Sequence, residues 1–114
     1  HYAAATGFYR QTLAPLGLSR LRDTGKEAAF GTPEHWGFFL YPAETSPTAP
    51  GLHLAFAASA RTEVAAVHAA ALAAGGKDLF SPRERPDISP TYFGAMFSDL
   101  DGHRIEVLTN ALPG

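Results

Sequence analysis

The chain has 114 residues, of which 46% are hydrophobic and none is cysteine, and its net charge is −2 with a pI near 6.2. This length and apolar content fit one compact domain with its own core. The charge offers no basic footprint for nucleic acid or an anionic membrane, and the lack of cysteine excludes disulfides and thiolate chemistry. No apolar run approaches the roughly 20 residues that span a bilayer. We therefore expect a single-domain cytoplasmic protein.

The first half of the chain predicts one helix followed by short strands. Residues 2–13 are rich in alanine and place Phe8, Tyr9 and Leu13 on one helical face. A proline and a glycine soon after predict the end of this helix. Three strands are then expected over residues 19–23, 27–31 and 36–41, the first two joined by a turn at residues 24–26.

A proline-rich linker over residues 45–50 is expected to separate the two halves. Beyond it, a strand over residues 52–58 leads into a helix over residues 61–74, with Ser59 as the expected N-cap. Gly75-Gly76 predicts the end of this helix. The helix face expected to be buried consists of Val64, Val67, Ala71 and Leu72. A short strand over 77–80 and a loop over 81–91 are expected to follow.

The closing stretch, residues 92–108, contains two apolar runs separated by Asp101-Gly102. Because Asp and Gly tolerate positive φ, this pattern predicts a hairpin with a two-residue type I′ turn. In its second strand Glu106 stands on the face opposite Ile105 and Val107. Burial of a carboxylate is costly unless it is paired or bound to metal. On this strand alone, a solvated edge or pairing with an arginine explains Glu106 as well as a ligand role does.

The strand over residues 52–58 shows the same kind of exception. Its bulky apolar residues alternate with a second face that is small except for the imidazole of His53. Such a face suits a cavity with a ligand group at its mouth, although a structural histidine is the alternative. Since His53 and Glu106 each stand on the less bulky face of a strand, a shared site is favoured.

The two halves follow one plan: a helix that ends at glycine, then three strands. Leu13 and Gly17 recur as Leu72 and Gly76, an internal repeat with an offset of 59 residues. A strand precedes the second helix, but the equivalent strand of the first half falls upstream of residue 1. We therefore expect an α+β protein whose first strand is absent from this numbering and lies upstream in the natural protein.

The order of elements, together with the motifs, resembles the vicinal oxygen chelate superfamily, which holds glyoxalase I, extradiol dioxygenases, and fosfomycin and bleomycin resistance proteins. The matching segments are residues 7–10, 13–17, 51–56, 68–76 and 99–107. The closing Asp-x-Asp-Gly-x-x-Ile-Glu is the most specific of them. The resemblance implies two βαβββ modules, residues 1–44 and 51–114, that form a curved mixed sheet around a cavity.

The resemblance also implies a metal site. His53 matches the ligand on the first strand of the second module, and Glu106 matches the carboxylate on the last strand. A histidine on the missing first strand usually completes a two-His, one-carboxylate set for a divalent metal such as Fe, Zn, Mn or Ni. A fourth ligand of the glyoxalase I type is expected to be lacking, because Phe38 or Phe39 stands at its position.

The first hypothesis for function is therefore a metal-dependent enzyme, of the lyase, isomerase or dioxygenase type, that acts on a small oxygen-chelating substrate. Glu106 and Tyr92 are its candidate catalytic residues. The second hypothesis is a metal-free protein that binds a flat small molecule, as bleomycin resistance proteins do, and the aromatic segments favour it. Candidate substrate-binding residues are Trp36, Phe38, Arg83, Arg85, Tyr92 and Phe93. The resemblance further implies a homodimer.

Overall fold

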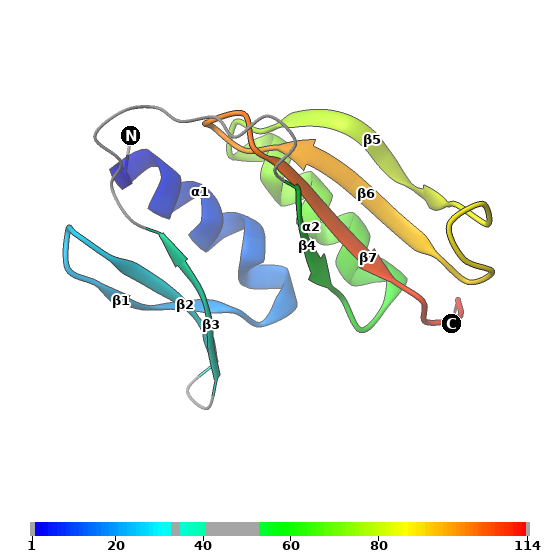
Figure 1. Cartoon of the computed structure of the whole chain (residues 1–114), viewed down its shortest axis with the longest axis horizontal. Coiled ribbons are helices and arrows are strands. Elements are labelled where there is room, and N and C mark those ends of the chain that lie inside the picture. Colours follow the sequence, from blue (N-terminus) through cyan, green and yellow to red (C-terminus); the bar gives the residue numbers. More distant parts are fainter. Residues whose placement is uncertain (1, 33–34, 41–52, 114) are drawn as a thin grey trace.

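The computed structural model describes residues 2–32, 35–40 and 53–113, and for His35 and Trp36 it describes the backbone alone. The expected linker over residues 45–50 lies outside this part. The elements, shown in Figure 1, are α1 (Tyr2–Leu13), a 3₁₀ turn η1 (Ala14–Leu16), β1 (Ser19–Asp23), β2 (Ala28–Thr32), β3 (His35–Leu40), β4 (His53–Ala57), α2 (Arg61–Ala73), β5 (Lys77–Glu84), β6 (Phe93–Ser98) and β7 (Arg104–Thr109). Neither helix is long and apolar enough to cross a membrane within the described residues.

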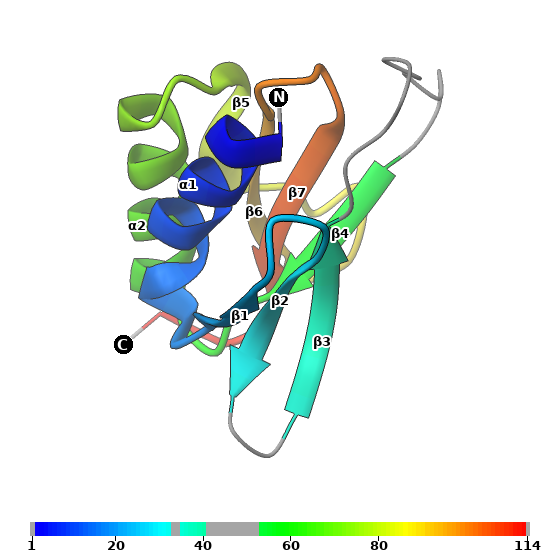
Figure 2. The same cartoon turned by 90° about the vertical axis from the view of Figure 1, so that its left-hand side faces the viewer.

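The strands form two sheets, and the helices cover one side of both (Figure 2). The first sheet is antiparallel with the order β1-β2-β3. The second has the order β4-β7-β6-β5, in which β4 runs parallel to β7 and the other pairs are antiparallel. The expected α+β class with a mixed sheet is confirmed. The second half is a complete βαβββ unit, and the described part of the first half supplies a helix and three strands.

Aromatic rings join the two halves at the core. Phe38 of β3 lies 4.9 Å from Tyr9 of α1, 5.9 Å from Phe30 of β2 and 5.4 Å from Phe56 of β4, measured between ring centroids. Such aromatic pairs contribute about 0.5–1.5 kcal/mol each beyond the apolar area they bury. Phe38 is therefore a packing residue that links the first sheet, α1 and the edge strand of the second sheet.

The end of α2 agrees with the sequence, but its start does not. Gly75 has φ 106°, and the Gly75 and Gly76 N–H groups donate to the Leu72 and Ala71 carbonyls, which is the Schellman arrangement. The N-cap is Ala60, so the prediction of Ser59 is wrong. Ser59 instead donates its N–H and its hydroxyl to the carboxylate of Glu63, both at 2.9 Å, one residue before the cap.

Two predictions about the second half need correction. The buried face of α2 includes His68, whose Nε2 lies 2.8 Å from Asp78 Oδ1, whereas Leu72 is 38% exposed. Strand β5 continues to Glu84, through part of the expected loop. Proline is tolerated there because β5 lies at the edge of its sheet and has an irregular register around Pro82.

The β6–β7 hairpin is confirmed, but its turn is not the predicted one. The connection runs from Asp99 to His103, with Ser98 paired to Arg104 and the Asp99 N–H donating to the His103 carbonyl. Only Gly102 of the connection has positive φ, at 87°, so Asp101 does not adopt the type I′ conformation. The longer turn leaves room for the Asp99 carboxylate to fold back over the backbone.

That carboxylate is buried and accepts four hydrogen bonds. Its Oδ1 accepts from the N–H groups of Asp101 at 2.9 Å and His103 at 2.8 Å. Its Oδ2 lies 2.5 Å from the Tyr9 hydroxyl and 2.9 Å from His103 Nδ1. Burial, followed by the hydrogen bond to Asp99 and its charge, raises the pKa of Tyr9 far above its usual range. Asp99 therefore ties the β6–β7 turn to α1.

This arrangement predicts alkaline destabilisation. Because the folded state raises the pKa of Tyr9, its stabilising contribution is complete below the ordinary value of 10.0 and is lost as the pH rises above it. Each such phenol contributes a slope of about 1.4 kcal/mol per pH unit. Urea unfolding of Tyr9→Phe should show about 1–3 kcal/mol less stability at pH 7 and a shallower alkaline decline. An equal alkaline slope in Tyr9→Phe and wild type would show that this phenol does not couple stability to pH.

Candidate active site on the open face of the second sheet

The second sheet has one buried face and one face turned away from α2, here called the open face. Ile105 and Val107 of β7 are fully buried beneath the helices, so the alternation of the strand turns Glu106 to the open face. Cross-strand partners share a face, and Glu106 pairs with Met96 and with Ala55. The row is completed by Phe80, the partner of Met96. One carboxylate therefore stands in an otherwise apolar row.

His53 reaches this carboxylate from the neighbouring strand. The parallel pairing of β4 with β7 aligns Ala55 with Glu106, which puts His53 on the same face two residues earlier. His53 Nε2 lies 2.8 Å from Glu106 Oε1. The His53 side chain is 40% exposed and that of Glu106 is 12% exposed, so the imidazole lies nearer to solvent than the carboxylate does. The two metal ligands implied by the resemblance are thus brought together.

Tyr92 approaches the same carboxylate from the start of β6. Its hydroxyl donates a short hydrogen bond to Glu106 Oε2, and the residue is 3% exposed. Burial, then the hydrogen bond and the charge of Glu106, raise the pKa of Tyr92 well above its usual range, while Arg85 and Arg83 oppose this shift. Tyr92 is therefore a protonated donor at neutral pH. Glu106 is held between His53 and Tyr92.

A glycine makes this contact possible. The Tyr92 ring lies across Gly94, where an added Cβ would stand 2.6 Å from Tyr92 Cζ. Real Cβ atoms do not approach other atoms this closely, so any side chain at position 94 must displace the ring. Sequence reasoning missed Gly94, since nothing in the alternation shows that Tyr92 folds back along the strand.

The His53–Glu106 pair fits two of the ligands of a divalent metal. Ligand atoms about 2.1 Å from a metal and at right angles to one another lie about 3.0 Å apart, close to the separation of this pair. Tyr92 provides the hydrogen bond to the second carboxylate oxygen that metal-bound carboxylates usually have. Within residues 2–32, 35–40 and 53–113, no third histidine, aspartate or glutamate atom joins the pair.

Another group of potential ligands, Asp99, Asp101 and His103, has donor atoms within 4.8 Å of one another. Both oxygens of Asp99 are already occupied by the hydrogen bonds of the β6–β7 turn. A metal ion there would have to displace the Tyr9 hydroxyl or the backbone donors. We therefore interpret this group as structural, and it explains the Asp-x-Asp-Gly motif.

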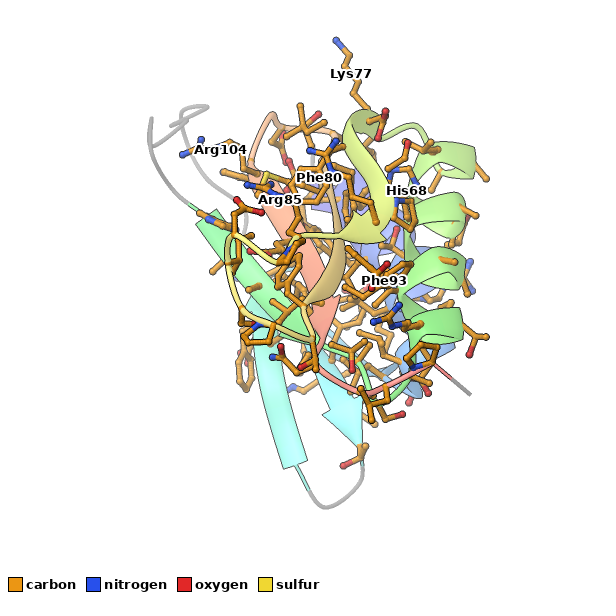
Figure 3. All side chains as sticks on the ribbon, turned by 90° about the vertical axis from the view of Figure 1, so that its right-hand side faces the viewer. His68, Lys77, Phe80, Arg85, Phe93 and Arg104 are labelled. Atoms are coloured by element: carbon orange, nitrogen blue, oxygen red, sulfur yellow. The ribbon has the colours of Figure 1, made fainter. Side chains whose placement is uncertain are left out.

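The predicted substrate-binding residues divide between the two faces. Phe93 lies under α2, with Arg61 Cζ 4.8 Å from its ring centroid, and Phe38 packs in the core, so the structure brings neither ring to Glu106. Arg83 and Arg85 instead lie over Phe80 on the open face. Figure 3 shows Phe80 and Arg85 on one side of the sheet and Phe93 on the α2 side. The Trp36 side chain lies outside the described part of the structure.

The role of Gly94 can be tested directly. Gly94→Ala should displace the Tyr92 ring, break its bond to Glu106 and return the pKa of this phenol toward its ordinary value of 10.0. A spectroscopic titration should then show one more tyrosine ionising near pH 10 than in the wild type. Gly7→Ala is the matched control, because a Cβ there meets nothing within 4 Å. An unchanged titration in folded Gly94→Ala would show that the ring does not depend on this glycine.

Comparison with known proteins identifies the family and the fold. Residues 1–107 match the family model of the Glyoxalase/Bleomycin resistance protein/Dioxygenase superfamily. A glyoxalase/bleomycin resistance protein from Albidiferax ferrireducens T118 has a similar structure, with a TM-score of 0.79, 24% identity, and coverage of 96% of this chain and 89% of that one. A glyoxalase-related enzyme from Fulvimarina pelagi also has a similar structure, with a TM-score of 0.70, 23% identity, and coverage of 96% of this chain and 80% of that one.

A third similar structure is a glyoxalase/bleomycin resistance protein/dioxygenase family enzyme from Burkholderia phytofirmans PsJN, with a TM-score of 0.71, 17% identity, and coverage of 97% of this chain and 91% of that one. At these identities the structures establish the fold alone. No functionally curated protein matches the chain in sequence. The family match over almost the whole length shows that the chain belongs to the glyoxalase/bleomycin resistance protein/dioxygenase superfamily.

Proposed function

We propose that this protein is a metal-dependent enzyme whose divalent ion is held by His53 and Glu106. The observation that supports the proposal is the 2.8 Å separation of His53 Nε2 and Glu106 Oε1 on the open face, with the carboxylate backed by Tyr92. A third ligand would come from outside the described residues. The substrate would be a small molecule with vicinal oxygens that coordinates through positions left open by the protein.

When bound, the metal would supply Lewis-acid polarisation of the substrate oxygens. The residues of the chain orient the metal ligands and line the site. Tyr92 holds the Glu106 carboxylate in one orientation, and its raised pKa keeps the phenol protonated as a donor. Met96 and Ala55, the partners of Glu106 in the sheet, give the site apolar walls. These residues are compatible with lyase, isomerase or dioxygenase chemistry and do not choose among them.

A metal-free binding protein is the second candidate. Both oxygens of Glu106 already have partners in His53 and Tyr92, so the carboxylate is satisfied without an ion. The site would then recognise a small molecule by its open apolar face and its few polar groups. The chain would be a sequestering protein of the same fold.

We also propose that the protein forms a homodimer. Strand β4 is the last strand of its sheet, and four of its five residues are exposed. An edge strand with free backbone groups is a template for pairing with another chain. The expected assembly is a closed pair of chains, which equilibrium sedimentation would detect.

Metal content distinguishes the two functions. After reconstitution of the full-length protein with Fe²⁺, Zn²⁺, Mn²⁺ or Ni²⁺ in turn, elemental analysis should find about one ion per chain in the wild type, as a single site requires. His53→Ala and Glu106→Ala should lose it, because each removes a ligand. Tyr92→Phe should bind at least about tenfold more weakly, since a supporting hydrogen bond to a ligand is lost.

The matched control is His103→Ala, which removes a donor of the structural group near Asp99 and should keep its metal. A wild-type protein that binds no metal after reconstitution would exclude the enzyme proposal in favour of the metal-free binding protein. Metal lost in His103→Ala but kept in His53→Ala would place the ion in the β6–β7 turn and contradict the assignment made above.

A further inference from the structure

Strand β5 contains an extra residue next to the candidate site. Phe80 pairs with Met96 and Arg83 pairs with Gly94, so three steps along β5 correspond to two along β6. In a regular strand Pro82 would follow Phe80 on the open face. The extra residue brings Arg83 to that face instead. Bulges of this kind often re-aim a side chain beside a functional site.

The bulge gathers two cations over one aromatic ring. Arg83 Cζ lies 4.7 Å and Arg85 Cζ 5.5 Å from the centroid of the Phe80 ring, within the range of cation–π attraction. Stacking positions a guanidinium by its flat face and leaves its N–H groups free to donate at the edge. In the described part of the chain, Arg83 forms no ion pair and no side-chain hydrogen bond.

Arg85, which lies over the Phe80 ring, already binds a carboxylate of the protein itself. Its Nε donates to Asp87 Oδ1 at 3.0 Å and its Nη2 to Asp87 Oδ2 at 2.7 Å, a two-pronged contact with an exposed carboxylate. Asp87 belongs to the turn after β5, and its side chain is 62% exposed. An arriving carboxylate would compete with Asp87 for the same donors.

These cations lie on the same face as the proposed metal ligands. Phe80 stands two strands from Glu106 in one cross-strand row, which corresponds to about 10 Å at the usual strand spacing. A ligand that touches both places needs an acidic group separated from its reactive oxygens.

We propose that the open face binds a small organic acid, with its carboxylate between Arg83 and Arg85, its apolar body along Phe80 and Met96, and its other end at Glu106 and His53. The inference rests on the proposed function only in placing the reacting end of the ligand at this pair. The smallest dicarboxylates, such as oxalate, are too short to occupy both ends. Asp87 acts as an internal competitor that fills the carboxylate position when no ligand is bound.

The test is a titration of ¹⁵N-labelled protein with benzoate, followed by NMR in buffer containing a chelator. Benzoate has a carboxylate and a flat apolar body, and its neutral analogue benzamide serves as the matched probe. We expect the Nε–H signals of Arg83 and Arg85 to shift with benzoate. Arg83→Gln should weaken benzoate about tenfold, since a charge-assisted hydrogen bond of this kind corresponds to at least that factor.

Asp87→Asn should have the opposite effect and strengthen benzoate binding, because it removes the competing carboxylate. Arg22→Gln, an exposed arginine of β1 in the other sheet, should leave the affinity unchanged. Equal affinities for benzoate and benzamide, or equal effects of Arg83→Gln and Arg22→Gln, would overturn the proposal. So would a weaker benzoate affinity in folded Asp87→Asn.

This experiment is independent of the metal. If benzoate binds as expected but the reconstituted wild type holds no metal, the anion site stands and the protein is a binding protein for organic acids. If metal binds at His53 and Glu106 but benzoate does not respond to Arg83→Gln, the enzyme proposal stands and the substrate class inferred above is wrong.

Discussion

The buried carboxylate of Asp99 is the constraint on which the rest of the second sheet depends. Its four hydrogen bonds hold the β6–β7 turn in one conformation and attach it to Tyr9 of α1. The turn sets the register of β7, and a slip of one residue would exchange the faces of a strand. Ile105 and Val107 would then leave the core and Glu106 would enter it. The same network that stabilises the hairpin therefore determines that Glu106 faces His53.

Most of the helices and strands could be predicted, because the alternation of apolar residues and the positions of glycine and proline are local properties of a sequence. Strand β1 and helix α1 have the predicted bounds, and β2 is displaced by one residue. Strand β3 begins one residue earlier than predicted, and Tyr41, its predicted last residue, lies outside the described part of the chain. The faces of His53 and Glu106 follow from period-two alternation, and family resemblance supplied the idea that the two strands are neighbours. Their contact at 2.8 Å is the outcome of the parallel β4–β7 pairing.

What could not be predicted depends on contacts between distant segments or on a change of register. The Tyr92 ring folds over Gly94 because of a backbone path that composition does not encode. The bulge at Pro82 extends β5 and turns Arg83 to the open face, although prolines alone suggest a loop. The packing of α1 and α2 decides that Phe38 and Phe93 lie on the buried faces of their strands. The sequence alone does not show this, because an aromatic residue in a strand suits a core and a binding site equally well.

We propose that His53 and Glu106 together hold a divalent metal on the open face. Anomalous diffraction at the absorption edge of the bound metal, from crystals of the reconstituted full-length protein, tests it most directly. We expect one peak about 2.1 Å from both His53 Nε2 and a Glu106 carboxylate oxygen, the usual distance for such ligands. A peak at Asp99, Asp101 and His103, or no peak in crystals that diffract well, would contradict it.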